Sequence, residues 1–191
     1  MRYVALCALV VCSAHPASAL TVIDTTPFAD SFVRALDVGE VYEQEIRVPA
    51  GETVLVSFSV FLAPDFHSSA LSFVFSIGDF SDIINVPASA GFSEVSIDVD
   101  ALLDPGGLYV AAFEGIGPPI RFKSSGSQNI NPYPEGDFTF VDVGGMRHND
   151  FADTLDLAFV AVFVPEPATA LLLMSGLVGL GLLRRRRLPG A

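Results

Sequence analysis

The residues with the clearest potential for chemistry lie in one acidic segment of the C-terminal half. Asp150, Asp153 and Asp156 follow one another at three-residue spacing, directly after Asn149, and Asp142 precedes them. Closely spaced oxygen ligands are what Ca²⁺, a hard cation, prefers in proteins. The segment lacks the register and the glycine of an EF-hand loop. We therefore expect solvated loop carboxylates with no resident metal or cofactor, and keep calcium as the alternative.

Recognisable catalytic motifs are missing from the sequence. Outside the first 19 residues the only histidines are His67 and His148, 81 positions apart and without a serine in a nucleophile elbow. There is no phosphate-binding loop and no metalloprotease helix motif. Paired carboxylates for glycoside hydrolysis cannot be located by counting, because acids are plentiful. We expect a protein that is not an enzyme, with a secreted hydrolase as the alternative.

The C-terminal end has three consecutive parts. Pro165-Glu166-Pro167 comes first, and an uncharged apolar run follows at 168–183. The third part is a run of four basic residues: Arg184, Arg185, Arg186 and Arg187. Both prolines lack the amide proton that a strand requires, so the first part should be an extended linker that a processing enzyme can grip.

The second and third parts together predict a membrane-inserted segment of fixed orientation. As a helix the apolar run would reach about 24 Å, somewhat short of a hydrocarbon core of about 30 Å. The positive-inside preference would hold the arginines on the cytoplasmic side, which places the body outside. An ordinary membrane anchor and a buried globular helix are the alternatives.

Residues 1–19 have the organisation of a secretory signal peptide. Arg2 precedes an apolar stretch from Tyr3 to Cys12, which is too short to span a bilayer stably. Ala17 and Ala19 place small residues at the positions that signal peptidase reads, so cleavage is predicted after Ala19. Signal peptidase and the general secretion machinery are thus expected partners. A lipoprotein signal at Cys12 fits less well, because the preceding residue is not small.

The whole C-terminal arrangement, residues 164–191, resembles the PEP-CTERM sorting signal. The resemblance implies an exosortase as partner, a membrane transpeptidase-like enzyme of Gram-negative bacteria that make exopolysaccharide. It also implies a route: export across the inner membrane, transient anchoring, removal of the tail, and release to the cell surface or extracellular matrix. Pro165, Glu166 and Pro167 would mark the sorting site.

A second, shorter resemblance lies near the predicted mature N-terminus. The segment Phe28-Ala29-Asp30-Ser31-Phe32 is similar to the FxDxF pattern that names one group of PEP-CTERM proteins, with Phe28, Asp30 and Phe32 at the fixed positions. The resemblance implies no particular activity. The segment also has a purely structural interpretation, in which both phenylalanines enter the core and the aspartate caps a turn.

The segment between the two ends is strongly acidic. Residues 20–164 hold 21 acidic and five basic residues, a net charge near −16. Such a body should repel nucleic acid and anionic headgroups, which leaves cations, polar glycans or basic surfaces as partners. The simpler interpretation is charge that keeps an exported protein soluble. Cys7 and Cys12 both lie in the predicted leader, so the body can form no disulfide framework.

Alternation of apolar and polar residues dominates this body and predicts strands. We expect them, separated by turn residues, at 40–48, 53–62, 71–77, 93–100, 108–113, 138–143 and 155–163. The pattern indicates an all-β domain at 20–163, an antiparallel β-sandwich of jelly-roll-like or immunoglobulin-like type. The last strand is apolar on both faces and should be central. Four prolines at 115–136 predict a long surface loop, the best place for binding.

Individual strands also predict which side chains share a face. In the first, the inward set is expected to be Tyr42, Gln44, Ile46 and Val48. In the second, it is expected to be Val54, Val56, Phe58, Val60 and Leu62.

These features predict an exported, non-enzymatic protein of the cell surface or exopolysaccharide matrix, associated with biofilm. The alternative is a carbohydrate-binding module on the same β-sandwich, in which loop aromatics such as Tyr109 and Tyr133 would stack on sugar rings.

Overall fold

The computed structural model describes residues 20–28, 31–63, 69–88, 93–125, 133–148 and 155–165. The predicted signal peptide at 1–19 and the predicted membrane segment at 168–183 lie outside these ranges. Among the residues that are described, no helix has the length and hydropathy needed to cross a bilayer.

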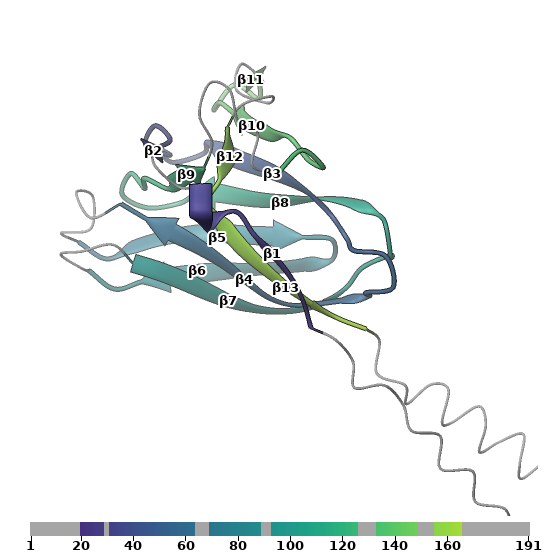
Figure 1. Cartoon of the computed structure of the whole chain (residues 1–191). Helices are drawn as coiled ribbons and strands as arrows, with labels where there is room; N and C mark the ends of the chain where they lie inside the picture. Colours follow the sequence, from purple (N-terminus) through teal and green to yellow (C-terminus); the bar gives the residue numbers. More distant parts are fainter. Residues whose placement is uncertain are drawn as a thin grey trace, which may run out of the picture.

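Two antiparallel sheets form the body and confirm the predicted all-β class. The four-stranded sheet has the order β1 (Thr21–Asp24), β13 (Phe159–Val164), β4 (Val54–Leu62), β7 (Ser93–Leu102). The six-stranded sheet has the order β11 (Arg147–His148), β10 (Phe138–Val141), β3 (Val41–Arg47), β8 (Leu108–Gly115), β5 (Leu71–Ile77), β6 (Phe80–Val86). The two sheets form the layers of a sandwich (Figure 1).

A small third sheet lies at one end of these layers. It joins β12 (Asp156–Leu157), β9 (Lys123–Ser125) and β2 (Ser31–Phe32). A short 3-10 helix, η1 (Thr26–Phe28), precedes β2.

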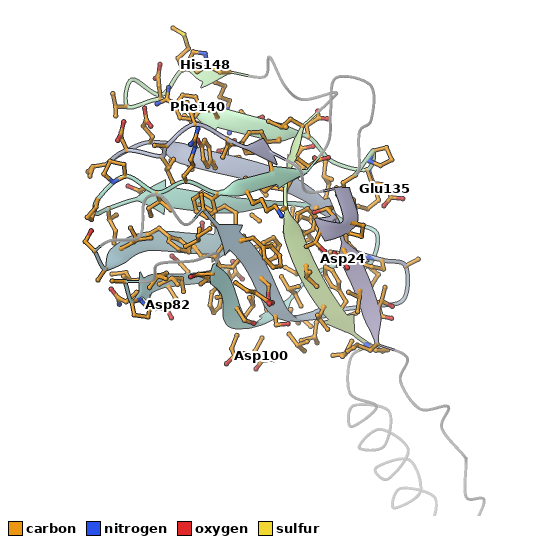
Figure 2. All side chains as sticks on the ribbon, turned by 60° about the vertical axis from the view of Figure 1, so that its left-hand side comes forward. Asp24, Asp82, Asp100, Glu135, Phe140 and His148 are labelled. Carbon is orange, nitrogen blue, oxygen red and sulfur yellow. The ribbon has the colours of Figure 1, made fainter. Side chains whose placement is uncertain are left out.

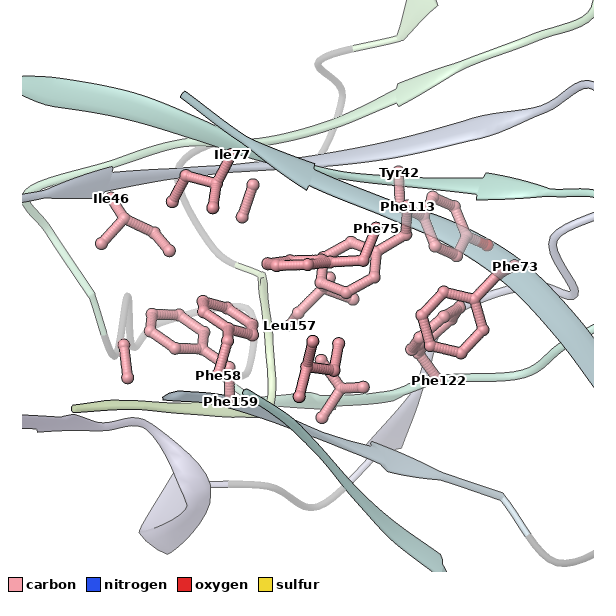
Figure 3. Packing of buried hydrophobic residues seen from close by; sticks show 14 of the residues in the cluster. Tyr42, Ile46, Phe58, Phe73, Phe75, Ile77, Phe113, Phe122, Leu157 and Phe159 are labelled. Carbon is pink, nitrogen blue, oxygen red and sulfur yellow. The ribbon is translucent and has the colours of Figure 1, made fainter. Parts of the chain in front are cut away.

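The core between the large sheets is built mainly from phenylalanine rings. Phe58 of the four-stranded sheet packs against Phe75 and Phe113 of the other sheet, at centroid distances of 5.2 and 5.9 Å. Phe159 stacks on Phe58 at 5.3 Å, and Phe122 closes one side against Phe113 at 5.3 Å. All five rings are completely buried (Figure 3). Aromatic pairs in such tilted or offset geometries add stability beyond the area that they bury.

Several strands match the sequence prediction closely. β5 coincides with the predicted 71–77, and its alternate residues from Leu71 to Ile77 are buried. In β3 and just after it, Tyr42, Gln44, Ile46 and Val48 are all buried, as predicted. The sequence-based prediction did not include β6, which pairs with β5 as a hairpin at the edge of the sheet. The alternation of β6 is broken because Asp82, which pairs with the buried Phe75, and Ile83 are both exposed.

The predicted inward face of β4 is wrong in its first part. Phe58, Val60 and Leu62 are buried, but the next buried residue toward the start of the strand is Leu55, while Val54 and Val56 are only half-buried. The register against β13 shifts at this point, where two steps along β4 oppose one step along β13. The extra residue of such a bulge reverses which side chains face the core.

The predicted surface loop at 115–136 is wrong at 120–125, whereas Ile116, Pro118 and Pro119 are exposed as predicted. Ile120, Phe122 and Ser124 are completely buried, and Lys123–Ser125 form β9. The backbone bonds to Leu36 on one side, through Leu36 N–H to Ile120 O at 2.7 Å and Ile120 N–H to Leu36 O at 3.1 Å. Pro118 and Pro119 therefore lead directly into a buried segment.

The two ends of the described body lie side by side. β1 pairs antiparallel with β13, so that Thr21 lies opposite Phe163 (Figure 1). β13 lies between β1 and β4, which confirms an interior position for the last strand. It extends to Val164, one residue beyond the predicted end of the domain.

Candidate functional site

The first candidate site is the point where the chain leaves β13, which we call the exit. The ladder ends there because Pro165 has no amide proton to continue it. The Val164 carbonyl accepts the Thr53 N–H at 3.3 Å, and the Thr53 carbonyl accepts the Leu103 N–H at 2.7 Å. The strand is thus held up to its last residue, and the predicted sorting residues begin directly after it.

The start of β1 is fixed at the same place. The Thr21 hydroxyl donates to Glu52 Oε1 at 2.7 Å, from the turn that precedes β4. Leu20, predicted to be the first residue after signal peptidase cleavage, therefore lies beside the exit. The two predicted processing positions are neighbours in space although they are more than 140 residues apart in sequence.

The second candidate site is an aromatic pocket of about 220 Å³ at the end of the sandwich remote from the exit. Figure 2 shows Phe140 and His148 at this end and Asp100 of β7 at the other. The side chains that line the pocket come from three separate segments: Val33, Arg34, Tyr42, Phe138, Phe140, His148 and Leu155. No local sequence pattern connects these segments, so sequence reasoning missed the pocket and had no signal that could have found it.

The polar rim of the pocket pairs two basic side chains with carboxylates. The Arg34 guanidinium lies 4.0 Å from the Phe140 ring centroid and forms an ion pair with Glu40. The His148 ring stacks on Phe140, and its Nε2 lies 3.2 Å from Asp142 Oδ2. The Arg34 guanidinium and the His148 ring thus each lie over an aromatic ring and next to a carboxylate.

Local hydrogen bonds set the protonation of this rim. The Glu40 carboxylate raises the pKa of Arg34, which stays charged. Burial raises the pKa of Tyr42, whose hydroxyl donates to the Arg34 carbonyl. The Met146 N–H, with smaller contributions from His148 and Gly144, lowers the pKa of Asp142. The pocket offers apolar ring faces, which suit it to holding a small apolar or planar group.

Asp156 is not the solvated loop carboxylate that the sequence predicted. It is completely buried; its Oδ1 accepts from Gln44 Nε2 at 2.9 Å, and its Oδ2 accepts from the Tyr133 N–H at 3.1 Å. Gln44 Oε1 in turn accepts the Leu157 N–H at 3.0 Å. Burial raises the pKa of Asp156 to about 6. A raised pKa suits a general acid, but this carboxyl has no exposed surface that a substrate could reach.

Asp156 is therefore no longer a candidate calcium ligand, because its two oxygens already accept hydrogen bonds from the protein. Asp150 and Asp153 lie outside the described residues. Within the described ranges, no three His, Cys, Asp or Glu side chains come close enough together to hold a metal ion.

The two tyrosines proposed for sugar stacking have different surroundings. Tyr133 is buried, with its ring edge-on to Phe159 at 5.6 Å and its hydroxyl accepting the Arg47 N–H at 2.8 Å. Its role as an exposed platform is thus wrong. Tyr109 is half-buried, and its hydroxyl accepts the Asp104 N–H at 2.9 Å.

The remaining predicted residues are largely beyond what the structure describes. Ala17, Ala19, Glu166, Pro167 and the four arginines at 184–187 lie outside the described residues, as does Asp30. Phe28 ends η1 and Phe32 ends β2. The FxDxF interpretation stays a prediction.

Comparison with known proteins gives one match. The family model described as the PEP-CTERM protein-sorting motif matches residues 163–187. No curated protein and no solved structure matches the chain. The chain carries a PEP-CTERM sorting motif, which begins within the last two residues of β13.

Proposed function

We propose that this chain is an exported, non-enzymatic protein of the bacterial cell surface or extracellular matrix, delivered and processed through its PEP-CTERM motif. The observation that carries the proposal is the match at 163–187, directly continuous with a folded β-sandwich. An exosortase-type enzyme in the inner membrane of a Gram-negative bacterium is the expected processing partner. Association with exopolysaccharide, as in a biofilm, is the expected destination.

The geometry of the exit supports removal of the tail without damage to the fold. Phe163 is completely buried, whereas the chain beyond Val164 makes no further ladder bonds in the described residues. A cut after Val164 would leave all of β13 in the body. Signal peptidase cleavage after Ala19 would likewise leave β1 complete, because that strand starts at Thr21.

Replacing Pro165, Glu166 and Pro167 together with alanine should reduce tail removal to background, because the extended, unpaired conformation and the Glu carboxylate are both lost. Intact mass measurement of released protein should find a chain that starts at Leu20 and lacks the arginine run. The triple variant should stay in the membrane fraction with its tail. Pro189→Ala, beyond the arginines, is the matched control and should be processed normally. Released protein that still contains Arg184 to Arg187 would contradict the proposal.

The carbohydrate-binding alternative now depends on Tyr109. Its ring lies next to Gly78 and Gly107, and its side chain is half-buried. If the sandwich is such a module, a glycan array should give binding that Tyr109→Ala reduces at least tenfold, since loss of an aromatic stacking partner costs on the order of 1–3 kcal/mol in the comparable case of nucleic acid bases. Absence of binding to neutral and acidic glycans would reject the carbohydrate-binding alternative, and the structural role would remain.

A further inference from the structure

The outer face of the four-stranded sheet carries an unusual apolar patch next to the exit. Leu20 and Leu102 are 58% and 71% exposed, and Val22 is 48% exposed. The full set, which we call the exit patch, consists of Leu20, Val22, Val54, Leu102, Val162 and Val164. A sheet face that meets water normally carries polar side chains, and clustered apolar exposure marks an interaction surface.

Strand pairing places these residues in continuous rows. Val164 pairs with Val54, and Val54 pairs with Leu102. Leu20 precedes Thr21, which pairs with Phe163, so Leu20 lies beside Val164. The row nearest the exit is therefore aliphatic across all four strands. Val22 and Val162, which pair with each other, extend the patch by one row.

The same face becomes polar with distance from the exit. Along β1 the outward residue after Val22 is Asp24, the last residue of the strand, which lies farther from the exit. Along β7 the outward residues before Leu102 are Asp100 and Asp98, both exposed. On these two strands the exposed apolar side chains thus lie at the end of the sheet from which the tail emerges. The two central strands keep Val160 and Phe61 on this face, but both side chains are half-buried.

The chain between the exit patch and the predicted membrane segment is short, so the patch must lie close to the membrane. Only Pro165 to Pro167 separate Val164 from the apolar run at 168–183. These three residues span at most about 10 Å when fully extended. If that run is inserted in a bilayer, the exit row must lie at the depth of the headgroups. Burial of aliphatic side chains in this region lowers the free energy.

We propose that the exit patch docks on the outer leaflet of the membrane while the tail is inserted, so that the sandwich lies against the bilayer with the sorting residues at the interface. This inference rests on the proposed function. A second copy of the chain is a poorer occupant, because a stable protein interface buries about 800 Å² per partner and six partly covered aliphatic side chains offer much less. Docking would present the sorting residues at one depth to a membrane-embedded processing enzyme. The nearby carboxylates favour zwitterionic over anionic lipid.

The test measures thiol accessibility in the full chain reconstituted in phosphatidylcholine vesicles. Cys7→Ser and Cys12→Ser remove the native thiols, and Leu102→Cys introduces one in the patch. Ile83→Cys, on edge strand β6 of the other sheet, is the control, because Ile83 is 55% exposed and lies away from the patch. We expect a bulky, water-soluble maleimide to react about tenfold more slowly at position 102 than at position 83, equivalent to about 1.4 kcal/mol in favour of the docked state. Adding Val22→Asp to the Leu102→Cys variant should restore the faster rate.

The outcomes separate this inference from the proposed function. Chain that floats with the vesicles but reacts equally fast at both positions would overturn docking and leave membrane insertion of the tail intact. Chain that does not float with the vesicles would overturn both. Slow reaction of the Leu102→Cys variant, accompanied by a disulfide between the introduced thiols of two chains, would assign the patch to a second copy and overturn docking on lipid.

Discussion

Replacing Phe113 with alanine should lower the free energy of unfolding of the body by about 4 kcal/mol, because it opens a cavity among rings that cannot collapse to fill it. The Phe113 centroid lies 5.1 Å from Phe75, 5.9 Å from Phe58 and 6.0 Å from Phe73. Phe58 belongs to the opposite sheet, so the loss falls on packing between the layers. Single domains are stable by only about 5–15 kcal/mol, so the variant should be close to unfolding at growth temperature.

The matched control is the same substitution at Phe80. This ring lies on edge strand β6, is partly exposed, and contacts Phe75 at 6.0 Å. Its loss should cost about 1 kcal/mol, as for a side chain that water already reaches. Urea titration followed by far-ultraviolet circular dichroism measures both, since the chain has no tryptophan to report by fluorescence. Equal losses at the two positions would mean that Phe113 is not a central packing residue.

The sequence predicts most of this core because period-two alternation records which side chains face inward. Leu71 to Ile77 and the Tyr42 to Val48 set follow this rule without exception, including the polar residue Gln44. The rule fails at β4, where a bulge inserts one residue and exchanges Val54 for Leu55 on the inner face. A bulge depends on the register with neighbouring strands, which a single strand's pattern does not contain.

The candidate sites differ in how far the sequence could predict them. The sorting residues are contiguous, so their order is readable directly. Predicting the exit patch would require knowing that β1 and β13 are neighbours, and this pairing joins residues from opposite ends of the body. Predicting the aromatic pocket would require knowing that three separate segments meet around Phe140. The prolines between 115 and 136 suggested a loop, because short buried pieces such as Ile120 and Phe122 give too few residues to show a period.

Replacing Asp156 with asparagine should change how stability depends on pH. The folded chain holds the Asp156 proton more tightly than the unfolded chain, because burial raises its pKa from the ordinary 3.8 to about 6. The stabilising contribution of the protonated form is therefore complete below about pH 3.8 and is lost as the pH rises through about 6. A shift of about two units corresponds to about 3 kcal/mol. Asparagine cannot ionise, so the variant should lack this loss.

The measurement is the difference in unfolding free energy between the parent chain and Asp156→Asn across that window. Comparing the two chains cancels the many exposed carboxylates, including Asp142, whose lowered pKa acts in the opposite direction. The asparagine amide has one acceptor oxygen, so one of the two donors, Gln44 Nε2 or the Tyr133 N–H, loses its acceptor and the variant should be the less stable chain at low pH. The difference should shrink by about 3 kcal/mol as the buried carboxyl of the parent chain ionises.

A second variant checks the assigned cause. The negative charge of Asp137 adds to the rise in the pKa of Asp156, although burial is the larger contribution. Asp137→Asn should therefore move the midpoint of the parent chain's pH transition to lower pH without abolishing it. A constant difference between the parent chain and Asp156→Asn at every pH would mean that water reaches this carboxyl. The same result would reopen the roles in metal binding and acid catalysis that its burial now opposes, because both require a carboxyl accessible from outside.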